Sequence, residues 1–349
     1  MNKIIFYIFI IVFFVKTGNV FSSNNIFNVD NIVVKNTANQ NKEKLLDKAF
    51  QEGFEKLTKK ILINKDLLSV EKTSLKEIKK LVSTYQIIEN EEFYVNDEVK
   101  VNLSFDREKI NRFFYVKGIS YADISDTDVV IFPVLIKNND FFLFSENYFY
   151  NNWSNQYFDE ENEFINYVLP IENLEDLQLI NSNKNDLESL PIKQILSNYD
   201  LKDYIFLIIT IKKNKIDIFL KGSISGNRVI KNFSVSSGDE GEDIIYNNAI
   251  KEVKREIDEI WKLQNLIDIR TPSFLNTVLE IKKDNDLLNL RKALNKIDLI
   301  ESYNVMELNT NYAKIKIKYL GKINKIKSKL DNQGIRVIIS NNEWKLKLI

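Results

Sequence analysis

Hydrophobic residues recur along the first third of the chain with the spacing of short strands and amphipathic helices. Residues 26–35 alternate like a strand, and in residues 41–62 apolar side chains return every three or four positions, which predicts a helix with one buried face. The same reasoning predicts the other elements of this region: a short helix at 75–81, strands at 82–95 and 99–105, and a helix from Asp106 to Gly118. We therefore expect a small α+β domain over residues 23–122.

Continuous apolar runs in the middle of the chain predict strands that are buried on both faces. Residues 129–136 (VVIFPVLI) and 204–211 have this pattern. A hairpin loop is expected at 222–227, and a long amphipathic helix at about 242–265. Its apolar stripe consists of Ala249, Ile250, Val253, Ile257, Ile260 and Trp261. We expect a second, α/β domain over residues 125–268.

Beyond Thr271-Pro272-Ser273, the predicted order over residues 273–349 is strand, helix, strand, strand, helix, strand. This is the order of a ferredoxin-like βαββαβ unit. The second helix is expected at 322–332, and the chain ends in strand segments around a turn at Asn341-Asn342. The predicted fold class is therefore α+β and multi-domain, with small α/β sandwich-like modules and a C-terminal ferredoxin-like unit.

The N-terminus has the pattern of a cleavable secretory signal peptide over residues 1–22. A short basic start precedes an apolar run at 4–15, and Val20 and Ser22 suit signal peptidase cleavage after Ser22. The run has roughly a dozen residues, whereas a membrane-spanning helix needs about 20. We expect a periplasmic protein. The alternative is an uncleaved anchor in the inner membrane formed by residues 4–15.

Composition excludes most common catalytic designs, because the 349 residues include no cysteine and no histidine. Disulfides, thiolate metal sites, cysteine nucleophiles and Ser-His-Asp triads all need one of these residues. Acid–base chemistry near neutral pH would need a perturbed carboxylate, lysine or tyrosine. We expect no cofactor and no metal, and a binding or structural protein rather than an enzyme.

Charge is unevenly distributed although the net charge is zero. Residues 120–200 contain 15 acidic side chains and three lysines, while residues 273–349 contain 15 basic and eight acidic side chains. This asymmetry has two interpretations: the two regions attract each other within the chain, or one of them binds a charged partner. Nucleic acid is not an expected partner, since no known binding motif is present.

Four segments resemble a family of exported proteobacterial proteins known as domain-of-unknown-function family 2066. They are FDREKINRFFYVKGIS (105–120), VVIFPVLI (129–136), LPIENLEDLQLIN (169–181) and NYDLKDYIFLIITI (198–211). The similarity runs from about Ile26 to the C-terminus. It implies a location in the cell envelope and no established activity. The Trp-rich stretch typical of the family is rich in Tyr and Phe here and keeps only Trp153.

The region 146–176 holds the candidate ligand-binding residues Trp153, Glu172, Glu175 and Asp176. Aromatic rings beside carboxylates can bind sugars, and paired carboxylates can hydrolyse glycosides. The simpler interpretation is that the acids at 159–163 lie in a solvated loop and that those after Pro170 cap a turn or helix.

Lysines alternate with isoleucines near the C-terminus, which suggests a face for an anionic partner or membrane. Its candidate residues are Lys314, Lys316, Lys318 and Lys322. A half-buried strand with solvated lysines explains the same pattern. Taken together, the sequence favours a non-enzymatic factor that binds another envelope protein. The alternative is a carboxylate-dependent enzyme or binder of envelope glycans that uses region 146–176. The oligomeric state is not predicted.

Overall fold

The computed structural model describes residues 26–35, 42–88, 98–123, 127–154, 164–195, 199, 202–213, 215–236, 241–340 and 343–349. The chain divides into two compact units, residues 1–112 and 113–349. The boundary between the units falls within helix α6 (Arg107–Lys117), whereas the sequence pattern placed it near residue 122. The apolar segment at 4–15 lies outside the described residues.

The first unit has a three-stranded antiparallel sheet in the order β1-β3-β2. Its elements are β1 (Asn28–Lys35), α2 (Lys42–Ile61), α3 (Asn64–Glu71), α4 (Leu75–Leu81), β2 (Val82–Ile88) and β3 (Glu98–Phe105). Helix α2 buries Phe54 and Leu57, as its periodicity predicts. A side chain at Gly53 would collide with Leu103 and Ile32, so glycine allows α2 to lie close to the sheet.

The central module of the second unit is a six-stranded sheet in the order β10-β9-β8-β5-β6, with β7 also paired to β5. The strands are β5 (Thr127–Lys137), β6 (Asp140–Phe142), β7 (Ile165–Val168), β8 (Asp203–Lys212), β9 (Lys215–Ile224) and β10 (Asn227–Ser236). Strand β5 runs parallel to both β7 and β8. The apolar runs predicted at 129–136 and 204–211 form β5 and β8, the centre of the sheet.

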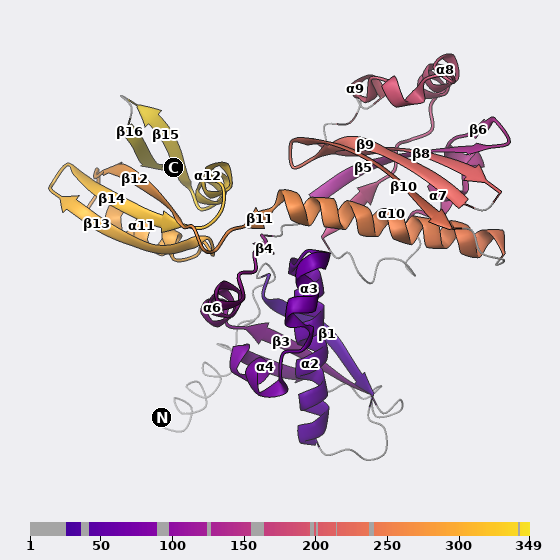
Figure 1. Ribbon diagram of the computed structural model, residues 1–349. Coiled ribbons are helices and arrows are strands. Elements are labelled where there is room, and N and C mark those ends of the chain that lie inside the picture. The colour runs from indigo at the N-terminus through magenta and orange to yellow at the C-terminus, as the bar shows by residue number, and fades with distance from the viewer. Residues whose placement is uncertain are drawn as a thin grey trace, which may run out of the picture. The chain divides into compact units, whose positions relative to one another are not determined.

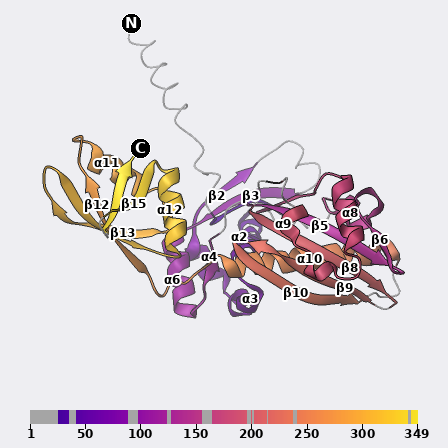
Figure 2. The same cartoon turned by 90° about the horizontal axis from the view of Figure 1, so that it is seen from above.

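Helices cover both faces of this central sheet, with α10 (Glu242–Gln264) on one face and α8 (Leu174–Ser182) and α9 (Ile192–Ile195) on the other (Figures 1 and 2). The six stripe residues predicted for α10 are all buried. On the opposite face, Ile180, Ile192 and Ile195 pack with Phe132 and Phe206 of the sheet. A short helix, α7 (Tyr148–Asn152), follows a three-residue 3-10 turn (Phe144–Glu146) after β6 and contacts both β5 and α10.

A two-stranded ribbon of β4 (Tyr121–Ala122) and β11 (Leu266–Ile267) links the entry and exit of the central module. Beyond it, the C-terminal module is a five-stranded sheet in the order β13-β14-β12-β16-β15. Its elements are β12 (Ser273–Glu280), α11 (Asp286–Leu294), β13 (Ile300–Leu308), β14 (Tyr312–Tyr319), α12 (Ile323–Asn332), β15 (Ile335–Ser340) and β16 (Glu343–Leu348).

The α+β class and the division into several sheet modules are confirmed. The strand segments predicted on either side of the Asn341-Asn342 turn form two separate strands, β15 and β16, so the module has one strand more than a βαββαβ unit. Strand β16 lies between β12 and β15 and runs parallel to β12. The ferredoxin-like description therefore fits the module loosely, because the inserted strand moves β15 to the edge of the sheet.

Candidate partner-binding site

Trp153 is fully buried rather than exposed to a ligand. Its ring lies edge-on to Tyr167, with 5.6 Å between ring centroids. The Lys254 ammonium of α10 lies 6.0 Å from the Trp153 ring centroid and 5.4 Å from that of Tyr167. Trp153 thus packs between β7 and α10, and its attraction to the lysine is a cation–π contact within the core.

The three predicted carboxylates lie at or just before the start of α8. Asn173 caps this helix, because its side-chain oxygen accepts a hydrogen bond from the Asp176 amide at 2.8 Å. The Asn173 amide nitrogen in turn donates to the Asp176 carboxylate at 2.6 Å. Burial raises the pKa of Asp176 above its usual value, against the lowering effect of the Asn173 hydrogen bond. Glu175 is exposed, and Glu172 accepts a hydrogen bond from Ser145.

Further hydrogen bonds hold the segment that leads into α8. The Tyr150 hydroxyl donates to the Pro170 carbonyl at 2.7 Å, and the Ile171 amide donates to the Tyr199 hydroxyl at 2.6 Å. No contact in the described part of the chain joins Trp153 to Glu172, Glu175 or Asp176. The acidic residues 159–163 lie outside the described residues. Within those residues, no group of three or more acidic side chains is arranged to hold a metal.

The predicted lysine face separates into two parts. Lys314, Lys316 and Lys318 all lie on the face of β14 opposite to its buried residues Ile315 and Ile317. Lys314 pairs with Glu307 at 2.7 Å and Lys318 with Glu301 at 2.8 Å. Lys316 lies 4.5 Å from the ring centroid of Phe274. Two of the three charges on this face are thus already paired.

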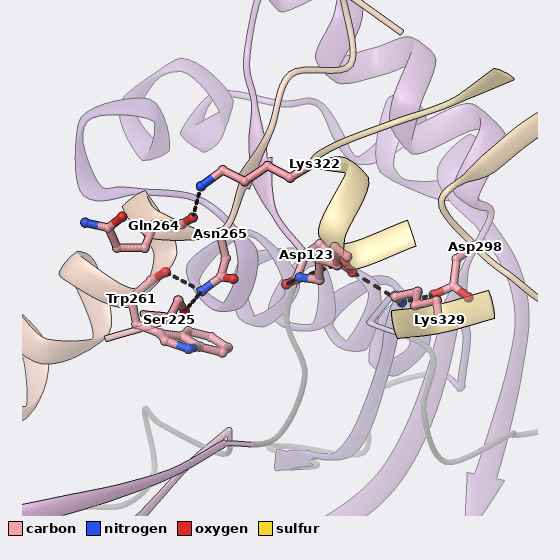
Figure 3. A network of polar contacts seen from close by, with 9 residues as sticks. Asp123, Ser225, Trp261, Gln264, Asn265, Asp298, Lys322 and Lys329 are labelled. Atoms are coloured by element: carbon pink, nitrogen blue, oxygen red, sulfur yellow. Dashed lines mark hydrogen bonds and ion pairs between the residues drawn. The ribbon is translucent and has the colours of Figure 1, made fainter. Parts of the chain in front are cut away.

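Lys322 lies elsewhere, at the junction between the central and C-terminal modules. Its ammonium donates to the Gln264 carbonyl at the end of α10, at 3.3 Å. From the same helix face, Lys325 and Lys329 approach Asp123, at 2.8 Å and 3.7 Å from its carboxylate oxygens. Figure 3 shows Lys329 beside Asp123 and Asp298. The spacing of these three lysines, three and four residues apart, places them on one side of α12. This side is used for contacts within the chain.

A cavity of about 350 Å³ lies between α11 and β13 in the C-terminal module. Its apolar walls come from both elements and from β14, and they comprise Leu287, Leu290, Leu294, Tyr303, Val305 and Ile315. Arg291 is the one charged residue in this lining. We refer to this cavity as the α11–β13 groove.

Strand β13 also forms an edge of its sheet, since β14 is its only partner among the described strands. The pairing is irregular between Ile300 and Ser302 and again between Val305 and Glu307, which leaves Ser302–Val305 as a regular stretch. Val305, Met306 and Leu308 are all exposed large apolar residues on this strand. The sequence pattern predicts this strand but not the groove. The consecutive apolar residues Val305 and Met306 break the alternation of the strand, and this break was the local indication of an apolar surface there.

Comparisons with known proteins found no matching family model, no similar curated protein and no similar solved structure. Among the described residues, no helix combines the length and apolar content needed to cross a membrane.

Proposed function

We propose that this chain is an exported, non-enzymatic protein of the cell envelope that binds another envelope protein. Its C-terminal module takes up an extended segment of that partner as an added strand on β13. One observation carries the proposal: the free edge of β13 and the apolar α11–β13 groove lie along the same strand. Strand addition is independent of the resemblance to the exported family, whereas the proposed envelope location rests on that resemblance and on the signal-peptide pattern of residues 1–22.

Strand addition joins two sources of binding free energy. Main-chain hydrogen bonds along the sheet edge supply affinity, and alternate side chains of the added strand enter a pocket and supply specificity. The regular stretch Ser302–Val305 offers roughly 13 Å of edge at about 3.3 Å per residue. Tyr303 and Val305 of this stretch also line the groove. An added strand would therefore place every second side chain against the apolar wall of α11.

The described chemistry of region 146–176 supports a binding role over a catalytic one. Trp153 is enclosed, the Asp176 carboxylate is committed to the cap of α8, and Glu172 is hydrogen bonded to Ser145. The chain also has no histidine or cysteine. A partner-binding protein needs none of these groups as a reacting centre.

The strand-addition proposal is tested with decapeptides selected from a random display library on the whole chain. Selected peptides are expected to protect from hydrogen exchange the alternate amides within Ser302–Val305 that point away from β14, because only these amides can pair with an added strand. Val305→Lys should abolish binding, since it places a charge at the groove. The matched control is Ile339→Lys, an equivalent change on the opposite edge strand β15, where Ile339 is also exposed. Selection of no peptide, or unchanged binding by Val305→Lys, would overturn the proposal.

Export is tested separately by expressing the full chain in a bacterial host and sequencing the N-terminus of the protein recovered from the periplasm. A mature chain that begins near Ser23 supports the proposal. An intact Met1 on membrane-bound protein would favour an anchor formed by residues 4–15, and full-length protein confined to the cytoplasm would contradict export.

A further inference from the structure

We infer that the segment bound at β13 carries an aspartate or glutamate side chain that pairs with Arg291. This inference rests on the proposed function and specifies the chemistry of the partner. It starts from the position of Arg291 on α11, one turn from both Leu287 and Leu294, which line the same groove. The guanidinium is thus attached to the wall that faces an added strand.

Among the described residues, the Arg291 guanidinium has no hydrogen-bonding or ion-pairing partner, whereas the Arg291 backbone carbonyl accepts a hydrogen bond from the Asn295 amide. No acidic residue lies three or four positions from it along α11. The acids on the nearest strand are engaged elsewhere, because Glu307 pairs with Lys314 and Glu301 with Lys318 on the other face of the sheet. Asp286, at the start of α11, accepts hydrogen bonds from the amides of Lys282 and Lys283.

The charge around Arg291 favours an anionic ligand. Residues 273–349 contain 15 basic and eight acidic side chains, and the neighbouring Lys292 and Lys296 are both exposed. Planar guanidinium groups bind carboxylates through two parallel hydrogen bonds, and such a pair is stronger beside apolar walls than in open water. The groove therefore fits a strand with apolar residues at alternate positions and one carboxylate among them.

An acidic side chain fits the groove better than the carboxylate of a chain terminus. Capture of a terminal carboxylate uses a nest of backbone amides in a loop or turn, whereas the residues that line the groove all belong to the regular elements α11, β13 and β14. A strand that continues past Ser302–Val305 in both directions also leaves its termini outside the groove. All test peptides are therefore amidated at the C-terminus, so that any carboxylate belongs to a side chain.

The experiment compares paired peptides that differ only in Glu against Gln, on the full-length chain. Because Arg291 is exposed, the wild type is expected to bind the Glu peptide about two- to fivefold more tightly than the Gln peptide, with a preference that declines as salt is added. Arg291→Gln should remove this preference and leave the affinity for the Gln peptide nearly unchanged. Arg291→Glu should reverse the preference towards a Lys peptide. The matched control is Lys292→Gln, which removes one positive charge at an exposed neighbouring position.

The outcomes separate the two proposals. If Val305→Lys abolishes binding but Arg291→Gln keeps the Glu preference, the acidic partner is wrong and strand addition survives. If Val305→Lys has no effect, the site itself is wrong. If a selected peptide loses its binding when its C-terminus is amidated, the assignment to a side-chain carboxylate is overturned. A concentration-dependent dimer that Val305→Lys abolishes would instead identify a second copy of this chain as the occupant.

Discussion

The Nζ atom of Lys325 lies 2.8 Å from a carboxylate oxygen of Asp123, whose side chain is almost fully buried. Asp123 directly follows the β4–β11 ribbon, whereas Lys325 belongs to α12 of the C-terminal module. Lys325 also donates to the Asp123 backbone carbonyl. This pair joins two modules that are distant in sequence, and its burial gives it an energetic weight that surface ion pairs lack.

Breaking the pair from one side should destabilise the fold strongly. Asp123→Asn leaves Lys325 with no full counter-charge in a partly buried site, and we expect a loss of about 3 kcal/mol in the free energy of unfolding. Lys325→Met should cost less, because Lys329 remains 3.7 Å from Asp123. The double variant should lose less than the sum of the single losses. Urea unfolding of the four proteins measures these differences.

The control for this cycle is an ion pair of the same length in an exposed position. Lys318 and Glu301 are also 2.8 Å apart, but both side chains are about one third exposed. Lys318→Met should cost less than about 1 kcal/mol, as surface pairs do. Equal losses at the buried and the exposed pair would show that the Asp123 contact is not a structural junction.

The same lysines illustrate where sequence reasoning reaches its limit. Isoleucines and lysines alternate along 312–319, and this local pattern correctly predicts a half-buried strand. The spacing of Lys322, Lys325 and Lys329 likewise places them on one helix face. Nothing local identifies Asp123 as their partner, because it lies 202 residues before Lys325.

Local sequence patterns also predicted other elements of the fold correctly. The stripe of α10 and the apolar runs of β5 and β8 are properties of neighbouring residues. The stripe is buried as expected, and so are both runs except at their ends, where Ile136, Tyr204 and Ile211 are partly buried. The insertion of β16 beside β12 depends on long-range pairing instead. The α11–β13 groove also depends on long-range pairing, because Arg291 and Val305 line the same groove only in the folded module. The burial of Trp153 was not predictable locally, because an aromatic residue beside acidic residues has the same sequence pattern in a core and in a binding site.

Gly222 should be the glycine of the central sheet that is most sensitive to substitution. A Cβ atom there would lie 2.0 Å from the Tyr204 carbonyl oxygen and 2.9 Å from Ile205 Cδ1. Gly222→Ala must therefore separate β9 from β8, at a cost of about 2–3 kcal/mol. The matched control is Gly241→Ala, because a Cβ atom at Gly241 meets nothing within 4 Å. Thermal unfolding of both variants tests the difference, and equal melting temperatures would contradict the close approach.

The raised pKa of Asp203 should lower the free energy of unfolding as pH rises. Burial raises its pKa above the usual 3.8, although hydrogen bonds from the Gly226 and Ser225 amides act in the opposite direction. Between 3.8 and the raised native pKa, the folded chain binds more protons than the unfolded chain, so the free energy of unfolding decreases with increasing pH. Relative to Asp203→Asn, the wild type should therefore lose stability as pH rises through this window.

Asp217 on the neighbouring strand β9 provides a control of opposite sign. Hydrogen bonds from Lys212, Lys215 and Ser234 hold the pKa of Asp217 well below its usual range. Its favourable contribution is present above the unfolded pKa and is lost as pH falls towards the native pKa. Urea unfolding from pH 3.5 to 7 should give opposite slopes for Asp203→Asn and Asp217→Asn, each relative to the wild type. Slopes of the same sign would refute the assignment for Asp203.

Substitutions at the N-terminal cap of α8 test whether the acidic residues around position 175 have a structural or a catalytic role. Asn173→Ala removes the acceptor for the Asp176 amide and should cost about 1 kcal/mol. Asp176→Ala should also destabilise, because it leaves the Asn173 amide nitrogen with fewer partners at a partly buried site.

Glu175→Ala is the matched control in the first turn of the same helix, and it should change the melting temperature little because Glu175 is exposed. Differential scanning calorimetry compares the three variants. If Asp176→Ala leaves stability unchanged, the Asp176 carboxylate has no structural role, and glycan binding or hydrolysis becomes the better interpretation of it. A loss matching that of Asn173→Ala would instead show that the two side chains act as one cap, since the hydrogen bonds run in both directions between them.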